Sequence, residues 1–145
     1  MISKKDKIIF NQIRKNAKIN LTDISKITGI PASTIYDRVK TNEKIIVKKH
    51  TTLLNFSKMR YHAKAKIAIK VSKIDKNKIQ EYFTQHSNVN SLYKTNYDYD
   101  FLLELIYPNY LMIEKFINNL ESKFDIKQKI IFNIIDDIKR EEFQI

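Results

Sequence analysis

GIPASTIYDRVK, residues 29–40, holds the only glycine in a chain of 145 residues and one of its two prolines. Hydrophobic spacing predicts a helix over residues 21–28, before this stretch, and a second over residues 32–42. Gly29 follows the first helix directly, where a left-handed backbone is common and glycine adopts it without penalty. Two short helices joined by such a turn form a helix-turn-helix. We expect a side chain at Gly29 to disturb the angle between the helices.

The neighbouring sequence extends this motif on both sides. Residues 4–16 predict an amphipathic helix with basic side chains on its outer surface. Within the helix over 21–28, Ile24 and Ile27 are expected to lie on one face, and Ile30 after the turn is expected to pack into the core. Residues 45–54, IIVKKHTTLL, are rich in strand-forming residues and lie where a winged helix-turn-helix carries its wing.

The helix over residues 32–42 is the candidate recognition helix, because the second helix of this motif enters the DNA major groove. Serine, threonine and tyrosine near its start are expected to contact bases or sugars, and its cations to contact phosphate or guanine. Asp37 would repel phosphate, so we expect it to orient Arg38 or a nearby lysine. Including two lysines of the wing, the predicted DNA contacts are Ser33, Thr34, Tyr36, Arg38, Lys40, Lys48 and Lys49.

The charge of the chain is unevenly distributed. Its net charge is +11, and residues 1–60 carry 14 Lys and Arg against 4 Asp and Glu, whereas residues 61–145 carry 13 against 12. A basic segment with a helix-turn-helix is typical of a protein that binds a polyanion, here double-stranded DNA.

The composition also excludes several kinds of chemistry. The chain has no cysteine, so it has no disulfide, thiolate zinc site or cysteine nucleophile, which is typical of a cytoplasmic protein. A single glycine excludes a glycine-rich phosphate loop. No apolar run reaches the roughly 18 residues of a membrane span. We therefore expect no metal, no cofactor and no enzymatic activity.

The second half of the chain changes to strand-like alternation. In HAKAKIAIKV, residues 62–71, small and apolar side chains alternate with lysines, which predicts a half-buried strand. Further strands are predicted over 89–95, 100–107 and 130–138, with helices over 75–86 and after Pro108. The order βαββαβ predicts a ferredoxin-like sheet with helices on one face, giving an α+β chain. The other face would be bare and apolar, which favours pairing with a second copy.

The chain resembles the Lrp/AsnC family, the feast/famine regulators, over nearly its whole length. The resemblance lies in DKIIFNQIRKNAKINLTDISKITGI for the first two helices, STIYDRVK for the recognition helix and DYDFLL at the third strand. It implies a winged helix-turn-helix domain over 1–50, a β-strand linker over 51–60 and a dimerisation and effector domain of RAM type over 61–145.

The family also implies a dimer, tetramer or octamer and, in many members, a small-molecule effector such as an amino acid. The family glycine near this ligand corresponds to Tyr97, which is expected to fill or reshape the pocket. Asp98 and Asp100 lie on one side of the same segment and are candidates for the amino group of an effector, or for simple turn residues. Ile45 replaces a second family glycine, before the wing.

Two alternatives remain open at this stage. Some relatives of the fold are enzymes that decarboxylate sirohaem with histidine and arginine, but the histidines here, His50, His62 and His86, have no evident acid or base beside them. The other alternative is an architectural protein that binds DNA with little sequence preference.

Overall fold

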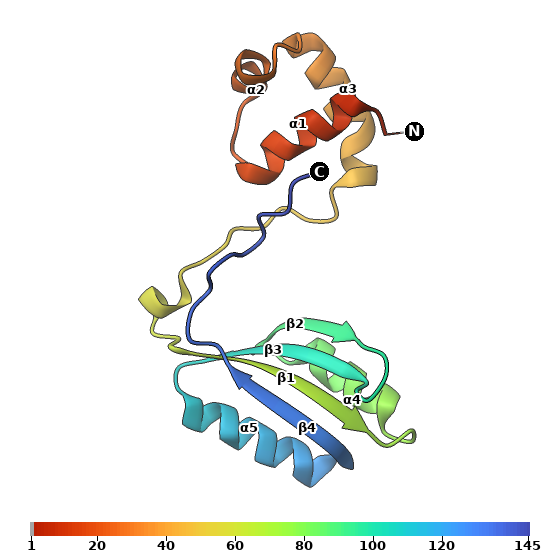
Figure 1. The fold of residues 1–145 in the computed structure, drawn as a ribbon, viewed down its shortest axis with the longest axis vertical. Coiled ribbons are helices and arrows are strands. Elements are labelled where there is room, and N and C mark those ends of the chain that lie inside the picture. Colours follow the sequence, from red (N-terminus) through yellow and green to blue (C-terminus); the bar gives the residue numbers. More distant parts are fainter. Residues whose placement is uncertain (1) are drawn as a thin grey trace. The chain divides into compact units, whose positions relative to one another are not determined.

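The computed structural model describes residues 2–145, which divide into two compact units (Figure 1). The helical unit runs to Leu53 and also contains Lys139–Ile145, and the sheet unit comprises Leu54–Ile138. The first boundary lies close to the one predicted. The last seven residues were predicted to belong with the sheet, but they lie with the helices.

The helical unit contains α1 (Lys4–Lys15), α2 (Leu21–Thr28) and α3 (Ala32–Ile46). The N-caps of α1 and α2 are Ser3 and Asn20, whose side chains accept hydrogen bonds from the amides three residues on. A small apolar core joins the three helices, and its buried members are Ile9, Ile24, Ile30 and Ile35.

Gly29 ends α2 in a left-handed conformation, with φ of 71°, and donates its amide hydrogen to the carbonyl of Ser25 at 2.8 Å. A β-carbon built at Gly29 would meet no atom within 4 Å. The glycine is therefore required for its backbone angle, and a side chain there would act through strain in the turn, because no neighbouring atom would crowd it. Ile27 is 61% exposed, so it does not share the buried face of Ile24 as predicted, whereas Ile30 is buried in the core as expected.

The β structure predicted over residues 45–54 is absent. α3 continues to Ile46, and the amide of Val47 still bonds to the carbonyl of Glu43 at 2.8 Å. Strand-forming side chains do not make a strand without a neighbour to pair with, and none of the residues described before Ala63 is in a strand. The strand predicted for the linker is likewise replaced by a short 3-10 helix, Phe56–Met59.

The sheet unit has the predicted order βαββαβ. Its strands pair antiparallel in the order β2-β3-β1-β4 (Figure 1). The elements are β1 (Ala63–Val71), α4 (Lys76–Gln85), β2 (Val89–Lys94), β3 (Phe101–Tyr107), α5 (Tyr110–Lys123) and β4 (Ile126–Asn133).

The fourth strand begins four residues before its predicted start and ends five residues before its predicted end. The sequence prediction followed the apolar run from Ile130 to Ile138. In the structure, α5 ends at Lys123 and the chain pairs with β1 from Ile126 onward. β4 is an edge strand, and edge strands often carry charged residues that prevent pairing with other chains. The polar residues at its start therefore hide the strand from a search for apolar alternation.

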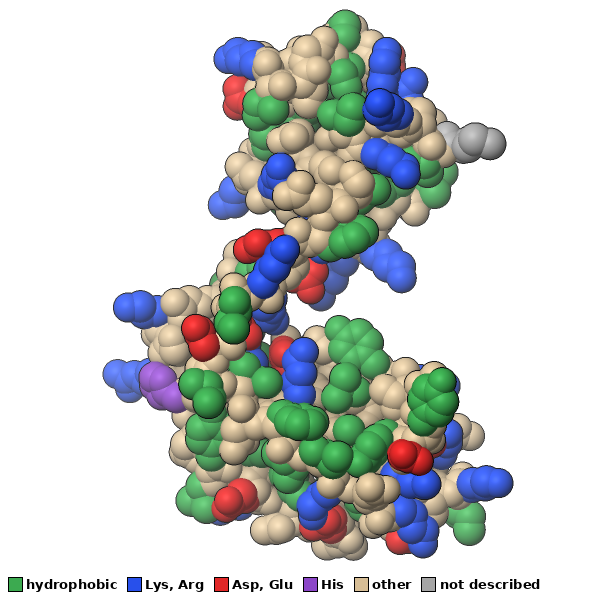
Figure 2. All heavy atoms as spheres, viewed as in Figure 1, with side chains coloured by type: hydrophobic (Ala, Val, Ile, Leu, Met, Phe, Trp, Pro, Cys, Tyr) green, Lys and Arg blue, Asp and Glu red, His purple; other side chains and the backbone are tan. Residues whose placement is uncertain are grey.

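Both helices of the sheet unit cover the same face of the sheet. Alternate residues of β1 and β3 pack there against α4 and α5, with Ile67, Leu103 and Phe83 completely buried. On the opposite face, Tyr93 and Phe132 are 57% and 55% exposed. Hydrophobic side chains gather on this unit in Figure 2. No helix in residues 2–145 has the length and apolarity needed to cross a membrane.

Candidate nucleic-acid interface

The outward face of α3 carries a row of exposed side chains. At about 100° per residue, Ser33, Tyr36 and Lys40 lie on one side of the helix, and all three are exposed. The Lys40 ammonium lies 5.8 Å from the centre of the Tyr36 ring, a cation–π arrangement that holds both side chains together. Thr34 lies at the border of this face and is half-buried. This row therefore presents hydroxyls, an aromatic ring and a cation to solvent.

The inward face of α3 anchors it to the rest of the helical unit. Ile35 is completely buried in the apolar core, and Val39 packs against the same cluster. The turn at Gly29 sets where α3 begins, and Ile35 and Val39 fix the side of the helix opposite the outward row.

Arg38 lies on the anchoring side rather than in the outward row. Its Nη1 donates to Asp6 Oδ1 at 2.9 Å and to the Ser3 hydroxyl at 2.7 Å. The carboxylate that holds Arg38 is thus Asp6 of α1 and not the predicted Asp37. Hydrogen bonds from the Ser3 hydroxyl and amide and from Arg38 lower the pKa of Asp6 to about 2, although burial alone would raise it.

The chain after α3 adds further cations. Lys48 and Lys49 are both exposed, as the prediction of phosphate contacts requires. Next to them, His50 Nε2 lies 3.1 Å from Glu43 Oε1. The helical unit as a whole carries 14 Lys and Arg against 6 Asp and Glu, and these cations project from much of the surface seen in Figure 2.

The last residues of the chain lie along α1, which the sequence did not reveal. The side-chain Nδ2 of Asn11 donates to the Ile145 carbonyl at 2.9 Å. The side-chain Oδ1 of Asn11 accepts from the Ile145 backbone amide at 2.9 Å. Arg14 donates to the Phe143 carbonyl at 2.9 Å and to Glu141 at 3.2 Å. These hydrogen bonds join residues that are far apart along the chain, so no local pattern encodes them.

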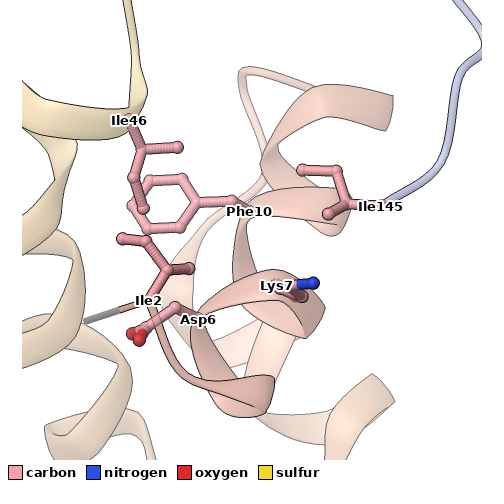
Figure 3. A pocket seen from close by; sticks show the side chains of 6 residues that line it. All are labelled: Ile2, Asp6, Lys7, Phe10, Ile46 and Ile145. Atoms are coloured by element: carbon pink, nitrogen blue, oxygen red, sulfur yellow. The ribbon is translucent and has the colours of Figure 1, made fainter.

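A shallow hollow lies where this tail meets the ends of α1 and α3. Figure 3 shows the Phe10 ring beside Ile2 and Ile46, with Ile145 approaching from the other side of α1. Three isoleucines and Phe10 make most of the lining apolar, so the hollow offers little to a polar ligand.

The predicted effector residues lie in the connection between β2 and β3. Tyr97 has a φ of 62° and is 94% exposed, so it does not fill a pocket within its own chain. Asp98 is exposed. Asp100 is held internally, since it accepts hydrogen bonds from Lys76 at 2.6 Å and from the Val71 amide at 2.9 Å, and these bonds lower its pKa.

Comparison with known proteins identifies this arrangement. Residues 2–41 match the family model described as winged helix-turn-helix DNA-binding. The transcriptional regulator FL11 of Pyrococcus furiosus is 30% identical over 118 residues, which cover 81% of this chain and 78% of FL11. LrpA of Pyrococcus abyssi is 37% identical over 62 residues, 42% of this chain and 44% of LrpA.

Solved structures match across both units. The transcriptional regulator NMB0573 of Neisseria meningitidis, in complex with L-Met, superposes with a TM-score of 0.88 at 18% identity, over 97% of this chain and 94% of its own. Escherichia coli AsnC superposes with a TM-score of 0.82 at 17% identity, over 97% of this chain and 96% of AsnC. These structures show the fold, and the relationship to FL11 and LrpA favours a regulator over the sirohaem-decarboxylating alternative. With its basic helix-turn-helix, its βαββαβ sheet and its relationship to FL11, this chain belongs to the Lrp/AsnC family of DNA-binding transcriptional regulators.

Proposed function

We propose that the protein regulates transcription from the cytoplasm, without enzymatic activity, by placing the outward face of α3 in the DNA major groove. The observation that supports this most directly is the exposed row of Ser33, Tyr36 and Lys40 opposite the buried Ile35. Ser33, Thr34 and Tyr36 contact bases or sugars, and Lys40 contacts phosphate or guanine. Lys48 and Lys49 add phosphate contacts from the chain that follows α3.

The regulator acts as a dimer or a larger homo-oligomer. The face of the sheet opposite the helices exposes Tyr93, Ile130 and Phe132, which is the apolar surface that a second copy would cover. A two-fold dimer binds a near-palindrome with half-sites about one helical turn apart, or a multiple of it. Phe132→Asp is expected to yield a smaller species in light scattering, whereas Lys115→Asp on exposed α5 is not.

A small-molecule effector, such as an amino acid, binds near the connection between β2 and β3. Support comes from NMB0573, which is described in complex with L-Met. The exposed Asp98 is free to meet an amino group, whereas Asp100 positions the loop through β1 and α4. Tyr97 lies beside both and shapes the site.

Selection of duplexes from a random pool at moderate salt tests the regulator against the architectural alternative. A regulator enriches one sequence with regular half-site spacing, and sequencing reads both. An architectural protein enriches no sequence, and that outcome would refute sequence-specific regulation.

The selected duplex then tests the α3 surface. When a substitution removes one cation that neutralises a phosphate, the slope of log K against log salt falls by about 0.9. Lys40→Ala should show this change and weaken binding to all duplexes, whereas Lys115→Ala, on the sheet unit, should not. Equal slopes for both variants would remove Lys40 from the interface.

A further inference from the structure

One buried carboxylate joins two turns of α3 to the start of α1. Asp6 Oδ1 accepts hydrogen bonds from Arg38 at 2.9 Å and from Asn42 at 3.2 Å. Asp6 Oδ2 accepts from the Ser3 amide at 2.7 Å and from its hydroxyl at 2.6 Å. Asp6 is only 1% exposed, so both of its oxygens act within the protein.

We call Asp6 and the two α3 residues that bind it, Arg38 and Asn42, the clamp. The clamp contacts α3 on the side opposite the proposed DNA surface. Arg38 and Asn42 are four residues apart and share one face of the helix. Tyr36 and Lys40 each lie two residues from Arg38, which places them about 160° around the helix from it. The Arg38 guanidinium is therefore directed toward α1, while the exposed row faces the other way.

The apolar core alone restrains the rotation of α3 weakly. The core cluster of the helical unit has four buried residues, including Ile35 on α3, and apolar packing has no preferred direction. Charge-assisted hydrogen bonds are directional and short. A shift of α3 by one residue would turn the exposed row by about 100° and break both of its hydrogen bonds with Asp6.

We propose that Asp6 is a positioning residue for DNA recognition. It fixes the rotation of α3 through Arg38 and Asn42, and Arg38 supports binding through this clamp and not by touching DNA. The proposal rests on the proposed function, since it takes the outward face of α3 as the DNA surface.

The proposal is tested by whether the removal of one negative charge strengthens or weakens DNA binding. Asp6→Asn and Asp37→Asn each remove one negative charge, the first from the clamp and the second from the exposed side of α3. If charge alone governs affinity, both variants bind DNA more tightly. If Asp6 positions α3, Asp6→Asn weakens binding to the selected duplex by at least about fivefold, and Asp37→Asn does not weaken it. In both variants, the affinity for a scrambled duplex should stay within about twofold of the wild-type value.

The salt dependence supplies a readout that altered stability would not move. Arg38→Gln should weaken specific binding with an unchanged slope of log K against log salt. A slope lowered by about 0.9 would mean that Arg38 touches a phosphate, and the proposal would be wrong. Equal or tighter specific binding by Asp6→Asn would overturn it as well.

A further variant keeps the test decisive if Asp6→Asn fails to fold, as judged by circular dichroism. Asn42→Ala removes the second hydrogen bond from α3 and leaves the ion pair, and it should lower the ratio of specific to non-specific affinity in the same direction. An unchanged ratio would then refute the proposal. If the wild-type protein binds no duplex in dilute buffer, it is the proposed function that fails.

Discussion

Tyr97 holds a backbone conformation that suits glycine, and replacing it should stabilise the protein. Its φ of 62° is left-handed, which costs an L-residue roughly 1–2 kcal/mol. Glycine avoids that cost but loses about 0.5–1 kcal/mol more conformational entropy on folding. The tyrosine side chain is 94% exposed, so its removal sacrifices little packing. We therefore expect Tyr97→Gly to raise the free energy of unfolding of the sheet unit by about 0.5–1 kcal/mol.

Calorimetry of the full chain is the assay, followed at the transition of the sheet unit. For a domain of this size, the expected gain raises the melting temperature by about 2–8 °C. Tyr97→Ala is the matched control, because it removes the same ring and keeps the backbone strain. Tyr97→Asn should fall between them, since asparagine tolerates the left-handed region.

The reasoning fails if Tyr97→Gly is no more stable than Tyr97→Ala. That result would mean either that the left-handed backbone costs nothing here or that the entropy of glycine cancels the gain. The same variants also test the proposed effector site. If Tyr97 narrows that site, L-methionine should raise the melting temperature of Tyr97→Gly more than that of the wild type.

Three further predictions concern the helical unit. Gly29→Ala should lower its free energy of unfolding by about 1–2 kcal/mol from backbone strain alone, measured by denaturant titration, and Gly29→Asn should lower it less. The pKa of Asp6 is lowered from an ordinary 3.8 to about 2, so its ionised form stabilises the folded state. This stabilisation is complete above about pH 4 and is lost as the pH falls toward 2. Acid titration should show a loss of at most about 2 kcal/mol in the free energy of unfolding, and Asp6→Asn should abolish this loss. Asn11→Ala removes both hydrogen bonds to Ile145 and should speed hydrogen exchange at the Ile145 amide, whereas Asn118→Ala on α5 should leave that rate unchanged.

Most of the fold follows from patterns within single segments. The helix-turn-helix was predictable because Gly29 follows a helical segment around Ile24 and precedes Ile35 and Val39, which are four residues apart on one helix face. The sheet was predictable because residues 63–71 alternate so regularly that only a half-buried strand fits them. The prediction failed at the start of β4, where polar residues of an edge strand give no such alternation.

The candidate site was less predictable, because its key hydrogen bonds join distant segments. Serine and aspartate three residues apart, at Ser3 and Asp6, are a recognisable capping signal for α1. That Asp6 also binds Arg38 depends on how α1 and α3 pack, which no spacing within the chain specifies. For the same reason, the sequence could place Tyr36 and Lys40 on an outward face of α3, but the position of Arg38 on the anchoring side required the structure.

Four described residues have a left-handed backbone: Gly29 and Glu141 in the helical unit, and Arg60 and Tyr97 in the sheet unit. The core cluster of the helical unit has four buried hydrophobic residues, against fifteen for the sheet unit. A penalty of roughly 1–2 kcal/mol is a large share of the stability of a small domain and a smaller share of that of a larger one. Glu141 bears this cost in the segment after the sheet, whereas Gly29 lies between α2 and α3, where strain would act on the orientation of α3. In the sheet unit an arginine and a tyrosine hold this backbone angle, and its larger core is better able to bear the cost of both.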